Sequence, residues 1–395
     1  MNRLLLKAAC VCLLSLFVFP SSAQISRVGS AATFDVATWN TEWFGAPGSG
    51  PNNDALQVQN VKDIMEGSEI ELWAVQEISN IPRFDELLGA LGPDWQGELA
   101  TNTGSQRIGF VWDTRVVTKR SIGHILESFS SDFAGRPPLK GEFLITLPDT
   151  SMIVTLINVH MKAFGDADSY QKRVNASGRV KNHIDFSSLA SASVVFLGDL
   201  NDELLSSTYA NQVSPYQNFV SDTAQYLAVS LPLEEANRFT WIGGSPGSNL
   251  DHIIISKRLA ASYIPNSGNT MDGLKTLIGF TAQTSDHVPV YASFGSSVVL
   301  DTEDENAVPA AFSVRDLYPN PATREVSLTI ASPRPAEARF ELYNSLGQLI
   351  LREDQSVMAG SQTVTLTWDD LPSGMYFVRV ASNRSVQTKP LLLVR

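Results

Sequence analysis

The stretch Val194-Val-Phe-Leu-Gly-Asp-Leu-Asn201 joins a short apolar run, typical of a buried strand, to an acid and an amide that follow it directly. Acids, amides and histidines stand beside five further apolar runs, at Asn40, Glu77, Asn158, His160, Asp251, Asp286 and His287. One such strand end is common, but six in one chain indicate a shared site. Ligand sites of α/β proteins lie at strand ends, so we expect these side chains to meet.

Strand-like and helix-like segments alternate around these motifs. The spacing of apolar residues predicts helices over 54–67, 81–91 and 168–189. Short apolar or β-branched runs predict strands over 34–39, 72–76, 108–112, 143–147, 153–158, 194–197, 250–256 and 288–293. This mixture is typical of an α/β domain in which helices cover the sheets.

The residue types at the strand ends narrow the chemistry. Carboxylates and amides suit a hard, oxygen-preferring cation such as Mg²⁺, with Mn²⁺ as the second candidate. Such an ion neutralises charge on a phosphoryl oxygen, and a carboxylate–histidine pair can position or deprotonate a water molecule. The sequence contains neither a G-x-S-x-G elbow nor a P-loop, so it gives no support to serine-nucleophile or P-loop chemistry.

Composition sets further bounds. The chain has 395 residues, of which 43% are hydrophobic and 18% charged, which suggests two or three domains and excludes a wholly disordered chain. The net charge of −12 argues against a protein that holds nucleic acid mainly by bulk electrostatics. Residues 107–181 differ, with 11 basic against 7 acidic residues. We expect most of these basic residues on solvated faces, which leaves a subset to line a phosphate groove.

Residues 1–23 have the features of a secretory signal peptide. Arg3 and Lys7 form its positive end, an apolar run covers 8–19, and Ser21-Ser-Ala23 offers small residues for cleavage. The run is shorter than the roughly 20 residues that cross a membrane. We therefore expect no transmembrane segment after signal removal, and no cysteine in the mature chain because both cysteines lie in the signal.

A linker is predicted over 296–312, where the acidic run Asp301-Thr-Glu-Asp-Glu305 lies among small and charged residues. It separates a first domain at 24–295 from a second at 313–395. Within the second domain, Thr363-Val-Thr-Leu-Thr-Trp368 alternates strictly between polar and apolar residues. With the turn signals around it, this pattern predicts a small all-β sandwich.

Six short motifs occur along the first domain in the order Ala37-Thr-Trp-Asn-Thr-Glu-Trp-Phe44, Ala74-Val-Gln-Glu-Ile78, Ile157-Asn-Val-His160, Gly198-Asp-Leu-Asn201, Leu250-Asp-His252 and Ser285-Asp-His287. In this order they resemble the endonuclease/exonuclease/phosphatase superfamily over about residues 33–295. The resemblance implies the deoxyribonuclease-I-like fold, a four-layer α/β sandwich of two packed sheets. It also implies a metal-dependent phosphoric ester hydrolase.

Residue roles follow from this resemblance position by position. It implies metal ligation by Asn40, Glu77 and Asp286. It implies catalytic roles for His160, Asp199, Asn201, Asp251 and His287. Among these, Asp251 orients His287, and Asp199 and Asn201 contact the nucleophilic water and the phosphate. Whether Asp199 or the Asp251–His287 pair takes the proton stays open.

The sequence also predicts how His160, Glu42 and His252 are placed relative to the site. The deoxyribonuclease pattern pairs the second histidine with a glutamate on the strand at 106–112, which here has no acid before Asp113, so we expect His160 to be held differently. Glu42 is a second possible metal ligand, but we expect a solvated loop acid. His252 alternates with Asp251 on a strand and should point away from the site.

The second domain also resembles a known family. Its motifs are Leu317-Tyr-Pro-Asn-Pro321, Leu342-Tyr-Asn-Ser-Leu-Gly-Gln348, Leu371-Pro-Ser-Gly-Met-Tyr-Phe377 and Lys389-Pro-Leu-Leu-Leu393. They resemble the type IX secretion sorting domain, which implies contact with the type IX secretion machinery and export through the periplasm to the medium or the outer cell surface. A carbohydrate-binding or spacer sandwich is the alternative.

Taken together, the sequence predicts a secreted, divalent-metal-dependent phosphodiesterase, foremost an endonuclease that hydrolyses DNA, with RNA as a second nucleic acid. The alternatives are a sphingomyelinase-like lipid phosphodiesterase, an inositol polyphosphate phosphatase and a non-catalytic surface-binding protein. Lipid enzymes usually need exposed apolar residues to engage a membrane, and the sequence shows no loop with a cluster of aromatic residues. The second-histidine motif Asn158-Val-His160 and the basic stretch 107–181 favour nucleic acid.

Overall fold

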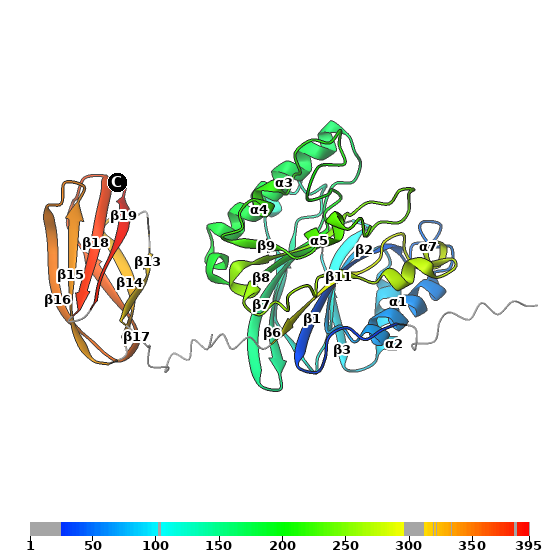
Figure 1. Ribbon diagram of the computed structural model, residues 1–395, viewed down its shortest axis with the longest axis horizontal. Helices are drawn as coiled ribbons and strands as arrows, with labels where there is room; N and C mark the ends of the chain where they lie inside the picture. Colours follow the sequence, from blue (N-terminus) through cyan, green and yellow to red (C-terminus); the bar gives the residue numbers. More distant parts are fainter. Residues whose placement is uncertain are drawn as a thin grey trace, which may run out of the picture. The chain divides into compact units, whose positions relative to one another are not determined.

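A computed structural model gives the fold and describes residues 25–101, 104–295, 312–318, 320, 322–332, 334–382 and 385–394. The chain divides into two compact units, residues 1–299 and 300–395, each described here by itself (Figure 1). This division falls within the expected linker. The expected signal peptide and all of the expected linker except residue 312 lie outside the described residues.

The first unit contains two six-stranded sheets. The first sheet has the order β11-β12-β1-β2-β4-β3, formed by Asn269–Thr270, Val290–Gly295, Thr33–Phe44, Leu72–Ile78, Arg107–Asp113 and Trp95–Leu99. The second sheet has the order β5-β6-β7-β8-β10-β9, formed by Val117–His124, Leu139–Leu147, Thr150–His160, Val194–Asp199, Asp251–Ser256 and Tyr226–Ala228. Every strand that the sequence predicts here is present, with bounds that shift by up to five residues.

Helices cover the outer face of each sheet. The first sheet packs against α1 (Asp54–Ser68) and α2 (Ile81–Leu91), and the second against α3 (Ala167–Asp185) and α4 (Gln217–Val220). The short helices α5, α6 and α7 span Leu231–Glu235, Lys257–Ala260 and Phe280–Gln283. Across the described part of the chain, no helix is both long and apolar enough to cross a membrane.

The main core lies between the two sheets, because alternate residues of each strand face the partner sheet. On β1, Phe34 and Val36 enter this core, while Ala37 and Trp39 pack outward toward the helices. From the second sheet, Leu197 on β8 and other inward residues complete the same core. Helices outside two stacked sheets make the four-layer α/β sandwich that the sequence predicts, and Figure 1 shows this arrangement.

A buried amide pair joins the two sheets close to the strand ends. Gln76 on β2 donates from Nε2 to Oδ1 of Asn158 on β7 at 2.8 Å. Asn158 in turn donates from Nδ2 to the carbonyl of Gly109 at 2.8 Å and to that of Val75 at 3.2 Å. Both amide side chains are fully buried, so losing either partner would leave unsatisfied polar groups at a cost of roughly 1–3 kcal/mol. This pair fixes the spacing of the sheets beneath the strand ends.

Strand pairing explains why distant motifs meet. β1 and β2 are parallel, with Asn40 opposite Gln76, and β7 and β8 are parallel, with His160 opposite Asp199. β10 runs antiparallel to β8 and begins at Asp251, directly opposite Asp199. Parallel strands end at the same edge of a sheet, so both sheets bring their polar residues to one end of the sandwich.

The second unit is the all-β sandwich that the sequence predicts. One sheet has the order β13-β14-β17, formed by Ser313–Tyr318, Glu325–Ser332 and Gly360–Thr367. The other has the order β16-β15-β18-β19, formed by Leu349–Val357, Ala336–Asn344, Gly374–Ser382 and Ser385–Leu393. Inward residues such as Leu328 and Ile330 of β14 pack against Phe340 and Leu342 of β15 in its core.

Candidate active site

A cavity of about 430 Å³ opens where β1, β2, β7 and β8 end. The residues predicted from the sequence that line it are Asn40, Glu77, His160, Asp199, Asn201, Asp286 and His287. The eighth, Asp251, lies fully buried beneath the cavity and contacts His287. The structure therefore brings all eight together, from segments that span nearly 250 positions of the sequence.

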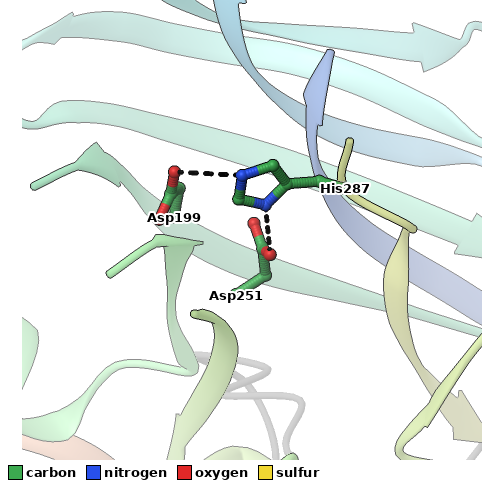
Figure 2. A group of neighbouring side chains, drawn as sticks. All are labelled: Asp199, Asp251 and His287. Carbon is green, nitrogen blue, oxygen red and sulfur yellow. Dashed lines mark hydrogen bonds and ion pairs between the residues drawn. The ribbon is translucent and has the colours of Figure 1, made fainter. Parts of the chain in front are cut away.

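His287 stands among three carboxylates. Its Nδ1 lies 2.6 Å from Oδ2 of Asp251, and its Nε2 lies 3.9 Å from Oδ2 of Asp199 and 3.8 Å from Oδ1 of Asp286. Figure 2 shows the ring between Asp199 and Asp251. Burial alone would lower the pKa of His287, but the charge and hydrogen bond of Asp251, with the other two acids, raise it to about 10. His287 is therefore an imidazolium at neutral pH.

The segment that carries His287 is tied to the end of β1. Trp39 donates from its indole Nε1 to the carbonyl of His287 at 3.0 Å, and Ser285 donates from Oγ to the carbonyl of Asn40 at 2.7 Å. All four residues are buried, so these bonds are shielded from water. They hold residues 285–287 in place although no regular element contains them.

Asp199 ends β8 and is positioned through both carboxylate oxygens. Asn40 donates from Nδ2 to its Oδ2 at 2.8 Å, and the backbone N–H of Asn201 donates to its Oδ1 at 2.9 Å. Burial and then the charge of Asp251 raise the pKa of Asp199 well above its usual range. Gly198 lets β8 approach β7 closely, because at its φ of +143° a Cβ would lie 2.1 Å from the Val159 carbonyl oxygen.

A second group of acids lines the same cavity. Glu77 accepts from the backbone N–H of Trp43 at 2.9 Å through Oε2 and lies 3.3 Å from Asn40 Nδ2 through Oε1. Asp286 accepts from Trp241 Nε1 at 2.8 Å through Oδ2. An N–H donor thus contacts each oxygen of Glu77, whereas Asp286 has one oxygen fixed in this way.

Glu42 corrects one expectation, because it is not a solvated loop acid. Its side chain is half-buried in the cavity, and its Oε2 accepts from the backbone N–H of Asp286 at 2.9 Å. Burial, followed by the negative charges of Asp286 and Glu77, raises the pKa of Glu42 to about 7. Its position two residues after Asn40 was the feature of the sequence that could have indicated a place in the cavity.

These acids fit a hard divalent cation. Glu42, Glu77 and Asp286 offer only oxygen ligands, and the repulsion that raises the pKa of Glu42 is relieved when a cation binds between such acids. Asp199, Asp251 and His287 also have ligand atoms within 4.8 Å of one another. However, Asp251 Oδ2 and His287 Nδ1 of that set lie 2.6 Å apart and are already hydrogen-bonded to each other. The first set is therefore the better candidate for the metal.

His160 is held through its backbone rather than by a glutamate on β4. Arg136 donates from Nε to the His160 carbonyl at 3.3 Å and from Nη1 to Oε1 of Gln106 at 3.2 Å. The His160 Nε2 lies 3.6 Å from Asp199 Oδ2, and its Nδ1 has no hydrogen-bond partner within the described part of the chain. Burial, with the positive charge of Arg136, lowers the pKa of His160, so its ring is neutral at pH 7.

His252 lies outside the cavity, as the strand alternation predicts. It is buried, its Nδ1 lies 3.1 Å from Ser230 Oγ, and its Nε2 lies 2.9 Å from the Asn249 carbonyl oxygen. Its hydrogen bonds are therefore satisfied within the fold and leave no group for catalysis.

Backbone strain is concentrated at this cavity. Five of its lining residues adopt the left-handed region that non-glycine residues avoid: Glu42 at +49°, Trp43 at +49°, Glu77 at +60°, Asn201 at +52° and Phe164 at +81°. Each such residue costs of order 1–3 kcal/mol unless its surroundings hold it in place. Strain of this kind gathers where function requires a side chain in a particular place.

Most of the basic stretch 107–181 is neutralised locally. Carboxylates lie within ion-pair distance of Arg115, Lys119, Arg120, Lys172, Arg173, Arg179 and Lys181. Among the residues that the structure describes, Arg107, Arg136, Lys140 and Lys162 have no such carboxylate. Arg136 contacts His160, so one unpaired cation lies directly behind the cavity.

A larger cavity of about 980 Å³ lies at the opposite ends of β1 and β2. Glu71, one of several acids that line it, accepts from the backbone N–H of Asp35 at 2.8 Å. Burial and the charge of Asp35 raise the pKa of Glu71 to about 8. This cavity shares no lining residue with the first, and none of the predicted site residues lies in it.

Comparison with known proteins agrees with this geometry. Residues 37–287 match the profile of the Endonuclease/Exonuclease/phosphatase family, and residues 316–394 match that of the Secretion system C-terminal sorting domain. No curated protein matches the chain. The second match indicates export by type IX secretion to the cell surface or the medium, through contact with that machinery.

Solved structures share the fold of the first unit. A humanized D. rerio TDP2 with 14 mutations is 17% identical, with a TM-score of 0.51 over 68% of this chain and 100% of that chain. D. rerio TDP2 complexed with a single strand DNA product is 16% identical, with a TM-score of 0.50 over 67% and 100%. An endonuclease/exonuclease/phosphatase from Bacteroides vulgatus is 14% identical, with a TM-score of 0.50 over 66% and 98%.

The fold, the cavity at the strand ends and a family match over most of the first unit agree, and the chain belongs to the Endonuclease/Exonuclease/phosphatase family of phosphoric ester hydrolases.

Proposed function

We propose that the first unit is a divalent-metal-dependent phosphodiesterase that hydrolyses nucleic acid, DNA in the first place. The observation that carries this proposal is the placement of the Asp251–His287 pair, at 2.6 Å, in the same cavity as Asp199 and the acids Glu42, Glu77 and Asp286. Hydrolysis of a phosphodiester needs a base for water, positive charge beside the phosphoryl oxygens and an acid for the leaving oxygen. The cavity supplies a group for each of these roles.

Asp199 is the group that takes the proton from water. Its raised pKa makes it a better base near neutral pH than an ordinary carboxylate. Asn201, whose backbone N–H fixes Asp199, lines the cavity and positions the water and the phosphate. We therefore assign the proton transfer to Asp199 rather than to the Asp251–His287 pair, whose carboxylate raises the pKa of His287 to about 10.

The imidazolium of His287 offsets the charge that develops on the phosphoryl oxygens and can give a proton to the leaving oxygen. Its Nε2 faces the cavity side of Asp199 while Nδ1 is held by Asp251. His160, neutral and also in the cavity, donates a hydrogen bond to the phosphate. A Mg²⁺ or Mn²⁺ ion held by Glu42, Glu77 and Asp286, with Asn40 beside them, would neutralise further charge on the phosphate.

Nucleic acid is favoured as the substrate because unpaired cations lie near the cavity. Arg136 contacts His160, and Lys162 follows β7 two residues after His160. A repeating phosphate backbone interacts with several such cations at once, and each neutralised phosphate adds to the salt dependence. With these two contacts, log Kd against log salt should have a slope of roughly 1.4 for a single strand. The fold also accommodates nucleic acid in D. rerio TDP2, which was solved with a single strand DNA product.

The test compares two variants of the full chain. Glu77→Gln and His287→Ala should each lower turnover of DNA by at least about 10²-fold in Mg²⁺, and chelation should abolish the activity. Glu71→Gln is the matched control, because Glu71 is a buried acid just before the other end of the same strand β2 and lies outside the cavity. Its activity should equal that of the unmodified protein.

The same assay decides between substrates. DNA, RNA, sphingomyelin vesicles and an inositol polyphosphate are offered in Mg²⁺ and in Mn²⁺ at low salt. Cleavage of sphingomyelin or the inositol polyphosphate, with both nucleic acids intact, would contradict the proposed substrate. Full activity of both Glu77→Gln and His287→Ala would contradict the proposed site.

A further inference from the structure

Two exposed aromatic residues, Phe164 and Trp43, lie at the rim of the cavity. Phe164 lies four residues after His160, lines the cavity and exposes 71% of its surface. Its φ of +81° is costly for a residue with a bulky side chain. Because the phenyl ring is exposed, burial of its apolar surface adds no folding stability that would offset this backbone strain.

A buried ion pair holds the Phe164 loop in place. Arg173 on α3 donates from Nη1 to the carbonyls of Lys162 and Phe164, each at 2.8 Å. Its Nε donates to Asp202 Oδ2 at 2.9 Å, and both charged side chains are fully buried. Asp202 directly follows Asn201, so the loop is fastened to the same segment that carries the proposed base.

Trp43 is the second exposed aromatic residue that lines the cavity, with 37% of its surface exposed and a φ of +49°. Its backbone N–H donates to Glu77 Oε2 at 2.9 Å, so the main chain that carries the ring is held next to a proposed metal ligand. Trp43 belongs to β1 in the first sheet, whereas Phe164 follows β7 in the second. Each sheet therefore contributes one exposed ring to the cavity.

A cation accompanies one of these rings. The Lys162 Nζ lies 4.5 Å from the centroid of the Phe164 ring, within range of a cation–π contact. The ammonium group lies over one face of the ring, so a base would stack on the other face while the cation contacts its phosphate.

Resting on the proposed function, we propose that Phe164 and Trp43 are stacking platforms for the bases on either side of the cleaved phosphate, and that the substrate is therefore a single strand. A base can stack on a protein ring only after it leaves its neighbours in the duplex. Unstacking a base from a duplex costs free energy, whereas the bases of a single strand are already accessible.

Membrane insertion is the competing use of exposed aromatic residues. It would require the rings to project from the surface and to face lipid together. Here both residues line a cavity together with the catalytic groups instead of projecting from the surface. The observations therefore favour a base over a lipid chain.

The test measures binding by the full chain bearing His287→Ala in Mg²⁺, so that the bound strand is not cut. The probes are a short single-stranded oligodeoxynucleotide, the same strand with every base removed, and its duplex. Phe164→Gly, which suits the left-handed backbone and removes the ring, should raise the Kd for the single strand about tenfold, within the range for loss of one stacked base. The Kd for the strand without bases should not change.

Two further variants separate stacking from other effects. Phe164→Trp should keep the affinity, because it restores a larger aromatic face at the same position. Phe186→Ala is the matched control, since Phe186 is 85% exposed at the end of α3 and does not line the cavity, and it should change neither Kd. A base analogue such as 2-aminopurine beside the cleaved phosphate should lose fluorescence on binding, and lose less with Phe164→Gly.

Several results would overturn the stacking proposal. These are an equal change in Kd for the strands with and without bases, no change for either, tighter binding of the duplex, or Phe164-dependent binding of sphingomyelin vesicles instead of the strand. If DNA is still cleaved in a Glu77-dependent way in any of these cases, the proposed function stands and only the stacking platforms fail.

Discussion

Replacing Asp251 with asparagine removes one negative charge from the centre of the site and keeps nearly the same shape. In the unmodified protein Asp251 Oδ2 lies 2.6 Å from His287 Nδ1, and both side chains are buried. The amide can still accept a hydrogen bond from Nδ1–H of a neutral imidazole. The neutral amide does not stabilise the imidazolium form of His287 by charge. The variant therefore tests whether the Asp251–His287 pair is charged.

The expected magnitude follows from the pKa of His287. A rise from 6.5 to about 10 corresponds to at most about 5 kcal/mol, at 1.36 kcal/mol per pH unit. Asp199 and Asp286 also favour the imidazolium, so we assign Asp251 about 3 kcal/mol of this stabilisation. Because the folded-state pKa is the higher one, this stability is fully present below pH 6.5 and is lost as the pH rises through about 10.

The assay is denaturant unfolding of both proteins in chelator between pH 6 and pH 10.5. The unmodified protein should be more stable by about 4–6 kcal/mol at pH 6, and about 3 kcal/mol of this difference should disappear toward pH 10. A constant part will remain, since Oδ1 of Asp251 has no donor in the described structure and the amide would place a buried N–H there at about 1–3 kcal/mol. A difference that does not vary with pH would refute the charged pair.

Three further predictions address other parts of the molecule. Asp202→Asn should destabilise the first unit by about 3–5 kcal/mol in denaturant unfolding, because it leaves the buried Arg173 uncompensated, and a loss below 1 kcal/mol would contradict the role of this pair. Glu71→Gln should raise the melting temperature at pH 9 but not at pH 4. Because the pKa of Glu71 is raised to about 8, its neutral form contributes its full stability below pH 4.5, and this contribution is lost as the pH rises through 8. Equal shifts of the melting temperature at both pH values would count against a buried charge. Deleting residues 313–395 should retain the protein in the producing cell, as measured by immunoblots of cells and medium, and normal export of the truncated chain would contradict the sorting role.

The strand-end motifs could be predicted because each is local in the sequence. An apolar run and the polar residue after it are adjacent, and parallel pairing alone brings such ends together. Four strands of the first unit without that signal were missed, β3, β5, β9 and β11, which are the edge strands of the two sheets, and the two longest of them show why. β3 (Trp95–Leu99) and β5 (Val117–His124) are edge strands whose residues are mostly exposed or half-buried, so they lack the alternation that identifies a strand.

The left-handed backbone of Glu42 and Phe164 could not be predicted, for a different reason. Each takes a left-handed backbone that its own residue type disfavours, so local propensity gives the wrong answer. Glu42 turns into the cavity because the Asp286 N–H holds its carboxylate, and Phe164 is held outward through Arg173. These contacts join segments far apart in the chain, and they exist only once the fold has formed.

The pairing of β1 with β12 has a consequence for synthesis. Thr33 lies opposite Gly295, so the first strand of the unit, β1, can pair with the last strand, β12, only after nearly the whole unit has been synthesised. Such distant pairing makes folding slow, because the entropy of closing a long loop must be overcome first. His287 enters with that last segment, and a nascent chain on the ribosome that has not reached it lacks the imidazolium. The candidate site is therefore complete only when translation of the unit is nearly finished.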